Sequence, residues 1–346
     1  MSETKPVIQL VNRLLFVLLS SVMMVFFSEK AYWYPPGYPI VELVLFYAIP
    51  VYSTLWAIDY FRVKRLSGMI LISAFYAFLV EGVMTPVIFE GGLFDPLMPI
   101  YFIGWHGLLA CVFGWYLIRK WLVEGAWKSI LIASMLFGIF WGIWSITYWA
   151  PASLVEWADM AAIGEPSIGD PRIPAEDFGI FAGTFTLMFV IAHWAMGRLG
   201  WQRSFRPSRI EGGIVFLALL FMFGTLSVPT APFGFLKLAV LLIIVAVPLY
   251  FNRRRETPDS LLSDLTAPVK RLHLLPLFLM PILATIVYGI LAGLNLSDAA
   301  LTALVEDVPL IQGLLGALFL IWAVFDTFWR GERVIVAGSI PQESIN

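Results

Sequence analysis

The sequence predicts an all-α fold: a polytopic integral membrane bundle of about ten transmembrane helices, with both termini in the cytoplasm. The first observation is a series of apolar runs of roughly 20 residues, each long enough to cross a ~30 Å hydrocarbon core as a helix. The second is composition, since 60% of the residues are hydrophobic, 13% are charged and the mean hydropathy is +0.85. The third is the distribution of basic residues, which fixes the predicted orientation.

The apolar runs follow one another along the whole chain, so we interpret 1–346 as a single transmembrane domain. The predicted spans are 7–27, 39–61, 67–87, 99–121, 127–149, 178–199, 210–228, 232–251, 272–294 and 308–329. Helix is favoured because backbone N–H and C=O groups in lipid must pair within the segment. The first span is interpreted as a retained helix, because no small-x-small cleavage site follows it.

Basic residues concentrate in every second loop and near both termini. Lys and Arg near helix ends remain on the cytoplasmic side, and 19 of the 22 basic residues fall on one side of the predicted bundle. They are Lys5, Arg13, Arg62, Lys64, Arg65, Arg119, Lys120, Lys128, Arg198, Arg203, Arg206, Arg209, Arg253, Arg254, Arg255, Lys270, Arg271, Arg330 and Arg333. The pattern predicts an integral protein of a prokaryotic cytoplasmic membrane with cytoplasmic N- and C-termini.

Two connecting segments are long. Residues 150–177 form an outer acidic loop with several prolines, and long loops of this kind are often functional covers. Residues 252–271 form a cytoplasmic linker before the last two spans. The basic cytoplasmic loops are those of an ordinary inner-membrane protein and do not indicate nucleic-acid binding. Protein partners are not indicated, whereas membrane lipid is an expected partner.

The sequence offers little for metal or thiol chemistry. Cys111 is the single cysteine and lies among apolar residues, which is typical of a buried, inert thiol. His106 and His193 lie at different depths, and metal-binding pairs of the His-x-x-x-His type are absent. We predict no metal site, and the sequence indicates no particular cofactor.

Aromatic residues make up 16% of the chain, and many lie well inside the predicted spans. Aromatic side chains can line a cavity for a long apolar or conjugated ligand such as an isoprenoid, a quinone or an acyl chain. They can equally pack helices together and face lipid. Under the first interpretation, Tyr76, Trp105 and Trp144 are the predicted substrate-binding aromatics, bordering a cavity formed by spans two to five.

Ionisable residues inside spans carry the strongest functional signal, because each costs about 2.5–3.5 kcal/mol at a helix centre. Glu81 lies about 20 Å along the third span, and His106 enters the fourth from the opposite end by roughly 10 Å. The two residues therefore reach similar depths on consecutive antiparallel helices. We predict that they lie within hydrogen-bonding reach and handle protons or orient a ligand. A structural bond tying the two helices is the alternative.

Two further charged residues enter spans from the same predicted outer face: Glu42 in the second span and Lys237 in the eighth. They are candidate substrate-binding residues beside the pair. The alternative is that both extend to the outer interface, as long charged side chains near helix ends commonly do. On the cytoplasmic half, Arg13, Asp59, His193 and Asp326 suggest a second polar cluster, with Asp59 and Arg62 close enough on one helix to pair locally.

Three functions compete on this reading. The first is a membrane protein that binds or acts on a hydrophobic molecule in an outward-opening intramembrane site. The second is a secondary transporter of a small solute with Glu81 and His106 in its pathway. The third is a structural subunit of a membrane complex. Bulky aromatic residues dominate the spans and small residues do not, which favours the first.

Overall fold

The computed structural model describes residues 6–31, 40–149, 174–198, 205–255, 260–294, 296 and 298–337. Every regular element in these ranges is helical, and ten of the helices are long and apolar enough to cross a membrane. The prediction of a ten-span, all-helical membrane protein is thereby confirmed. Most of the predicted outer loop, 150–173, lies outside the described residues. The side of the membrane on which each terminus lies stays a prediction.

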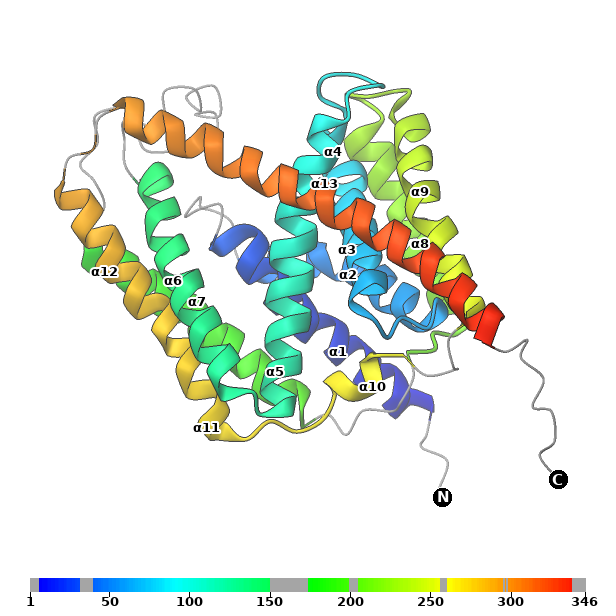
Figure 1. The fold of residues 1–346 in the computed structure, drawn as a ribbon, viewed down its shortest axis with the longest axis horizontal. Coiled ribbons are helices and arrows are strands. Elements are labelled where there is room, and N and C mark those ends of the chain that lie inside the picture. The colour runs from blue at the N-terminus through cyan, green and yellow to red at the C-terminus, as the bar shows by residue number, and fades with distance from the viewer. Residues whose placement is uncertain are drawn as a thin grey trace. The chain divides into compact units, whose positions relative to one another are not determined.

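The chain alternates α-helices with π- and 3-10-helical segments (Figure 1). In order they are α1 (Pro6–Val25), η1 (Phe26–Lys30), α2 (Ile40–Tyr60), α3 (Leu66–Leu79), η2 (Val80–Met84), η3 (Pro86–Phe89), α4 (Leu97–Phe102), η4 (Ile103–Leu117), α5 (Ile118–Glu124), α6 (Trp127–Trp149), α7 (Ala175–Met196), α8 (Arg209–Met222), η7 (Phe223–Ser227), α9 (Gly234–Arg255), α10 (Leu262–Leu265), α11 (Arg271–Leu274), η8 (Leu275–Phe278), α12 (Leu279–Gly293) and α13 (Asp298–Ala337). η1, η2, η4 and η7 are the π-helical segments.

Several predicted boundaries need correction. The third span ends at Met84 and not at residue 87, because Pro86 disfavours helical geometry at Thr85, which is extended. The sixth span begins three residues earlier than predicted, directly after Pro174, so the outer loop is shorter by the same amount. The last helix, α13, is 40 residues long and exceeds the predicted span at both ends. The predicted span was bounded by apolar residues alone, whereas the helical backbone of α13 continues past them into polar residues at both ends.

The predicted linker 252–271 is also partly helical. α9 continues through Arg255, and α10 forms a short turn at Leu262–Leu265. Ser260 is buried and donates a hydrogen bond of 3.2 Å to an Asp59 carboxylate oxygen. The backbone N–H of Leu261 donates to the carbonyl of Val63. This part of the linker is therefore held against the turn between α2 and α3.

Contacts group the chain into two compact units, each built from three separate stretches. Unit 1 comprises Met1–Val51, Leu109–Trp201 and Asp264–Gln312. Within it, α6 and α12 run side by side (Figure 1). A Cβ atom at Gly142 would lie 2.6 Å from the carbonyl oxygen of Ala284, and one at Gly138 would lie 2.7 Å from that of Met280. Two glycines one turn apart therefore let the backbones of α6 and α12 meet.

An aromatic cluster forms much of the unit 1 core. Phe26 and Phe27 of η1 contact Phe137 of α6 and Phe189 of α7, with ring centroids between 4.6 and 6.4 Å apart. Trp141 adds an edge contact to Phe26 at 5.4 Å. Such offset and edge-to-face pairs stabilise a core beyond simple burial. We call these five residues the aromatic cluster.

Unit 2 comprises Tyr52–Leu108, Gln202–Ser263 and Gly313–Asn346. α3 is its central helix, since nearly all of its residues are buried, and it packs against α9. A Cβ atom at Gly316 of α13 would lie 2.7 Å from the backbone nitrogen of Gly104 in η4. This close approach of two glycines brings α13 against the helix that carries His106.

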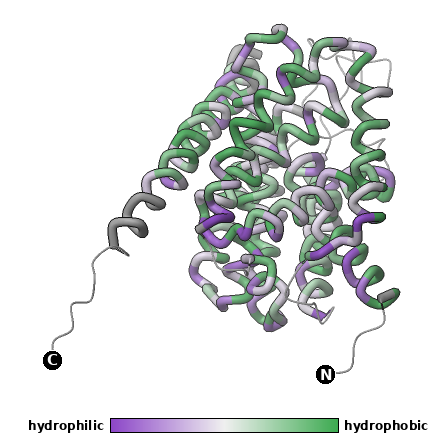
Figure 2. The backbone as a smooth tube through the Cα atoms, turned by 90° about the vertical axis from the view of Figure 1, so that its right-hand side faces the viewer, coloured by the Kyte–Doolittle hydropathy of each residue, from purple (hydrophilic) through white to green (hydrophobic). Residues whose placement is uncertain are grey.

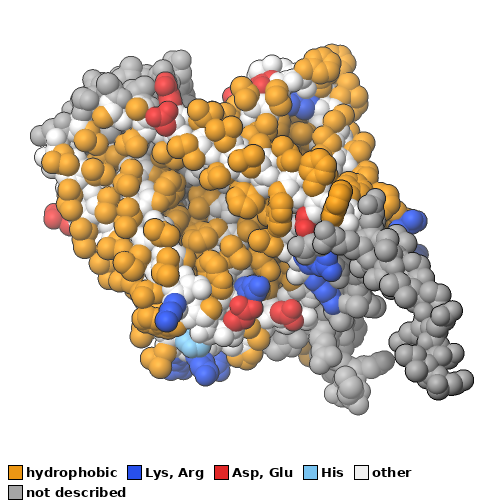
Figure 3. All heavy atoms as spheres, in the orientation of Figure 1, with side chains coloured by type: hydrophobic (Ala, Val, Ile, Leu, Met, Phe, Trp, Pro, Cys, Tyr) orange, Lys and Arg blue, Asp and Glu red, His pale blue; other side chains and the backbone are white. Residues whose placement is uncertain are grey.

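Apolar side chains cover the outer faces of the helices, as a lipid environment requires. Ile282, Ile286 and Ile290 form one stripe along α12 and are 51%, 51% and 59% exposed. Figure 3 shows hydrophobic side chains over most of α12 and α13 on the face that it displays. Figure 2 shows apolar residues along most of the helix that leads to the C-terminus. An apolar stripe this long is typical of a lipid-facing surface.

Candidate functional site

The site begins with Glu81, whose position follows from a local change in helix geometry. α3 passes without interruption into η2, a π-helical segment of five residues that contains Glu81. π-Helical turns are rare and are frequently found at functional sites. Glu81 is buried, with 6% of its surface exposed. The side chain therefore points into unit 2 and away from lipid.

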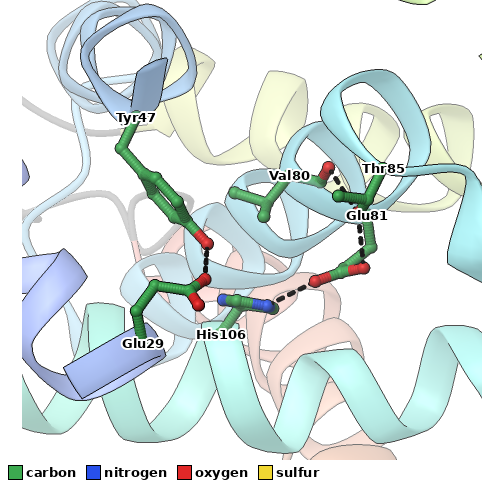
Figure 4. Close-up of polar contacts among 6 residues, drawn as sticks. All are labelled: Glu29, Tyr47, Val80, Glu81, Thr85 and His106. Atoms are coloured by element: carbon green, nitrogen blue, oxygen red, sulfur yellow. Dashed lines mark hydrogen bonds and ion pairs between the residues drawn. The ribbon is translucent and has the colours of Figure 1, made fainter. Parts of the chain in front are cut away.

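His106 lies on the second π-helical segment of unit 2. η4 runs for 15 residues from Ile103, an unusual length for a π-helix. The imidazole is 1% exposed, and its Nε2 atom lies 2.5 Å from Oε1 of Glu81 (Figure 4). The predicted proximity of the two residues is confirmed by this geometry. Their role in proton handling stays a prediction.

The second carboxylate oxygen of Glu81 has its own donor. The Thr85 hydroxyl donates to Oε2 over 2.7 Å and lies 3.3 Å from the Val80 carbonyl, so it is placed at the end of the π-helical segment (Figure 4). Thr85 can take this position because the helix ends there before Pro86. Both oxygens of Glu81 are thus engaged, and this fixes the orientation of the carboxylate.

Aromatic rings surround the imidazole of His106. Trp105 stacks on it at 4.7 Å with an interplanar angle of 11°, and Phe102 stacks at 5.9 Å. Tyr76 meets it edge-on at 6.4 Å. These rings shield the pair from water, so that electrostatic attraction between carboxylate and imidazolium is stronger than at a surface. Tyr76 is fully buried, whereas Trp105 is half-buried.

This arrangement can hold one proton between two atoms. A proton held by a carboxylate and an imidazole in contact can reside on either group, giving an ion pair or a neutral acid beside a neutral imidazole. The total charge of the pair is the same in both states. A carboxylate next to an imidazole is accordingly a common acid–base device.

A cap of loop and helix ends closes the same end of unit 2. The Lys237 ammonium donates to the Gly92 carbonyl over 2.9 Å, and the Ser227 hydroxyl donates to the Gly82 carbonyl over 3.0 Å. Ser227 thereby binds a carbonyl near the end of η2, where helical partners run out. Lys237 is only 6% exposed, and its bond to Gly92 holds the segment between η3 and α4. Its predicted alternatives, ligand binding and extension to the outer interface, stay predictions.

Glu90 is a further acidic residue beside the pair that sequence reasoning assigned only to an outer loop. Burial raises the pKa of Glu90, and the negative charge of Glu81 adds to this effect. Glu90 follows η3 and is exposed. The charge of Glu81 therefore acts on a group at the edge of the cap.

The remaining predicted ligand-binding residues lie in unit 1. Glu42 is exposed in the first turn of α2, as expected for a carboxylate at an interface. Trp144 is buried in α6 and stacks on Phe140 at 6.4 Å. The cavity predicted to join Trp144 with Tyr76 and Trp105 stays a prediction.

Sequence reasoning missed a polar group at the end of the first span. It ended that span at residue 27, whereas η1 continues the helix to Lys30. The Tyr47 hydroxyl donates to Oε1 of Glu29 through a short hydrogen bond (Figure 4). Lys30 is 4% exposed, with its ammonium 5.4 Å from the centroid of the Phe185 ring. The signal was the Glu-Lys pair directly after an apolar run.

Arg119 is among the basic residues that the sequence assigns to the cytoplasmic side, and its burial could not be predicted from that assignment. It is fully buried in unit 1 and donates to three backbone carbonyls, those of Leu265, His193 and Ala267, over 2.6, 2.5 and 2.8 Å. Carbonyls at helix ends lack helical donors and carry partial negative charge, so a guanidinium is a suitable partner. Arg119 therefore fastens the segment after α10 to the last turns of α7.

The second predicted polar cluster does not form as one group within either unit. Arg13 and His193 belong to unit 1, while Asp59 and Asp326 belong to unit 2. Asp59 accepts from Ser260, and Arg62 donates to the Arg253 carbonyl at 3.5 Å. Among the described residues, no three His, Cys, Asp or Glu side chains gather as metal ligands would. Cys111 is fully buried.

Comparisons with known proteins add no assignment. No protein family, no curated protein and no solved structure matches this chain.

Proposed function

We propose that this multi-pass membrane protein binds a hydrophobic molecule of the lipid, isoprenoid or quinone class, and that Glu81 and His106 exchange a proton with it or orient it. One observation carries the proposal: a buried contact of 2.5 Å between the Glu81 carboxylate and the His106 imidazole, on two π-helical segments inside membrane-spanning helices. Ionisable residues within spans ordinarily mark functional sites.

Stability alone is a weak reason for such a pair. Replacing a buried ion pair with well-packed apolar residues is often neutral or stabilising, because two charges must be removed from water. In this protein the helices also depart from α-geometry at the two residues concerned. A bond that merely tied α3 to η4 would need neither the charges nor the π-turns. Proton exchange needs both an acid and a base held at contact distance.

The surroundings favour a hydrophobic partner. The imidazole lies among Phe102, Trp105 and Tyr76, and Trp105 retains partial exposure. Binding sites for apolar ligands combine such an aromatic wall with a few oriented polar groups. Thr85, also half-buried, holds the Glu81 carboxylate at the edge of this wall. A ligand arriving from lipid would meet Trp105 and Thr85 before the pair.

The test compares bound lipid in the purified protein, in Glu81→Gln and in Glu124→Gln. Glu124 is a matched control because it pairs only with Lys120 at an exposed position, 3.8 Å apart. Extracted lipids are identified by mass spectrometry and absorption. We expect one lipid class to be enriched over bulk membrane in the wild type and in Glu124→Gln, and to be lost from Glu81→Gln. Unchanged lipid, activity and growth phenotype in a destabilised Glu81→Gln would leave the pair as a structural tie.

A secondary transporter is the second candidate, and the buried ionisable groups of unit 1 favour it. Lys30, Arg119 and His193 are each at most 4% exposed inside membrane-spanning helices, and a carrier needs polar groups through its depth. Proteoliposomes loaded with a pH-sensitive dye distinguish the two functions. Solute-driven proton flux that is abolished by Glu81→Gln would favour transport, whereas its absence together with an enriched lipid favours the first proposal. If the purified protein retains a stoichiometric protein partner and shows neither lipid enrichment nor proton flux, the structural subunit would be favoured.

A further inference from the structure

His193 of unit 1 is a buried imidazole whose ring nitrogens lack hydrogen-bond partners among the described residues. The side chain is 0% exposed. Its described contact is apolar, an edge-on approach of Phe189 at 4.4 Å. Buried polar atoms without partners are uncommon in proteins and particularly costly within a membrane span. Each such atom therefore requires an explanation.

Two buried hydroxyl groups of unit 1 also lack hydrogen-bond partners within the described part of the chain. Thr186 lies two turns before His193 on α7, and Ser134 lies on α6. Ser and Thr hydroxyls in spans usually bond to a carbonyl of the preceding turn, as buried Ser21 does to Val17 over 2.8 Å and exposed Thr184 does to Ile180 over 2.7 Å. Thr186 and Ser134 do not make this bond, so their hydroxyls remain open to another partner.

The three residues border the same part of the core. Thr186, Phe189 and His193 occupy one buried face of α7, at helical spacing. Ser134 lies one turn before Phe137 on α6. Phe189 and Phe137 both contact Phe26 and Phe27 of the aromatic cluster. The two helices therefore present their unpartnered groups around one shared aromatic wall.

Charge decides which ligand fits. The Arg119 guanidinium binds the backbone carbonyl of His193 at 2.5 Å, so a fixed positive charge already lies beside this residue. A neutral imidazole has one donor and one acceptor nitrogen, and each hydroxyl both donates and accepts. An anion satisfies only donors and a cation only acceptors. Water satisfies both.

We propose that unit 1 holds a buried water site in which ordered waters bond to His193, Thr186 and Ser134. Thr186 and His193 are about 10 Å apart along α7, a distance that roughly two or three waters would bridge. Internal waters normally bind polar groups that lack protein partners. The site is separate from Glu81 and His106 and gives His193 a proton-exchange partner inside its span. It does not rest on the proposed function.

Isosteric substitution tests the hydroxyls through the sign of the stability change. If water binds Thr186, Thr186→Val removes a hydrogen-bonded group and lowers the melting temperature. If the hydroxyl has no partner at all, the same change removes a desolvation penalty and raises it. Thr184→Val is the matched control on the same helix, since its hydroxyl is exposed and bonded to a carbonyl. A rise for Thr186→Val or Ser134→Ala would overturn the proposal.

Nuclear magnetic resonance of the wild-type protein tests the imidazole directly. The chain has three histidines, so ¹⁵N-imidazole labelling in lipid bilayers gives few signals. His193→Phe identifies the His193 signals, and the measurement itself is made on the unmodified protein. We expect cross-peaks between the His193 ring nitrogens and water protons, and exchange in D2O. Cross-peaks confined to protein protons, without exchange, would overturn the water site. Neither result depends on whether a hydrophobic ligand binds near Glu81.

Discussion

A double-mutant cycle measures how strongly Glu81 and His106 depend on each other. The perturbations are Glu81→Gln, His106→Gln and the two combined. Gln at position 81 keeps an oxygen able to accept from Thr85, so the 2.7 Å bond there survives and only the charge is lost. Gln at position 106 places an amide near the original Nε2 atom. Each single variant therefore leaves one buried ionisable group beside a neutral amide.

The expected magnitude follows from burial and contact distance. The partners are 6% and 1% exposed and 2.5 Å apart, so solvent screens their interaction little. Breaking a buried pair costs about 3–5 kcal/mol, and because each single variant retains a hydrogen bond we expect a smaller loss, about 2–3 kcal/mol. In the double variant the two amides can bond to each other. We expect it to lose at least about 1 kcal/mol less than the sum of the single losses.

Unfolding in mixed micelles with increasing SDS, followed by circular dichroism, supplies the free energies. The control cycle uses Lys120→Gln and Glu124→Gln, an exposed pair 3.8 Å apart on one helix, whose coupling we expect to be about 0.3–0.5 kcal/mol. Additive losses at Glu81 and His106, within about 0.5 kcal/mol, would refute the inference that the two act as one unit.

Three other predictions concern topology, packing and pH. Cysteine in Ser167→Cys should react with an impermeant thiol reagent on intact cells, and cysteine in Lys270→Cys, an exposed position, should not; the opposite labelling inverts the orientation. Gly142→Ala places a Cβ 2.6 Å from a backbone oxygen, so it should cost about 1–3 kcal/mol in unfolding free energy, whereas Gly183→Ala, with nothing within 4 Å, should not destabilise. Burial and a neighbouring carboxylate raise the pKa of Glu90, so its contribution to stability is full at low pH and is lost as pH rises through that pKa. Glu90→Gln should remove this loss from melting curves recorded between about pH 4 and 7. An unaltered pH profile in the variant would contradict this prediction.

The number and order of the spans could be predicted from the sequence because lipid imposes one solution on a long apolar run. The backbone must pair internally, and the helix is the only way to do so in a single segment. Helix ends beside prolines were predicted only to within a few residues. Pro86 and Pro174 each shift a boundary by three residues, because hydropathy does not register backbone geometry.

The Glu81–His106 pair could be predicted because depth in a bilayer is nearly linear in residue number. Two ionisable residues at one depth on adjacent helices have few other partners. The π-helical segments that present them could not be predicted, since no composition rule distinguishes a π-turn from an α-turn in an apolar run. The same limit hid Glu29 at the end of η1.

Arg119 and Lys237 show a different limit. The sequence assigned Arg119 to the cytoplasmic side and Lys237 to the outer face by their distances from span ends, but it did not indicate the carbonyl groups that each side chain binds. In the structure both are buried because backbone carbonyls of other segments accept their protons: Gly92 for Lys237, and Leu265, His193 and Ala267 for Arg119. Such carbonyls leave no trace in composition. Only the folded chain shows which loop comes back to a buried cation.

The π-helical segment η2 has a genetic consequence. A π-turn is equivalent to an α-helix with one residue inserted, so the site lies one codon away from an ordinary helix. Deleting Val80 would restore α-geometry, and Glu81 would move into the position that Val80 now holds, about one residue step of 100° around the axis, whereas residues after the turn would keep their alignment with α3. Glu81 would then face away from His106, although no polar residue had been replaced. The pair could therefore be gained or lost through a change in chain length alone, without any substitution.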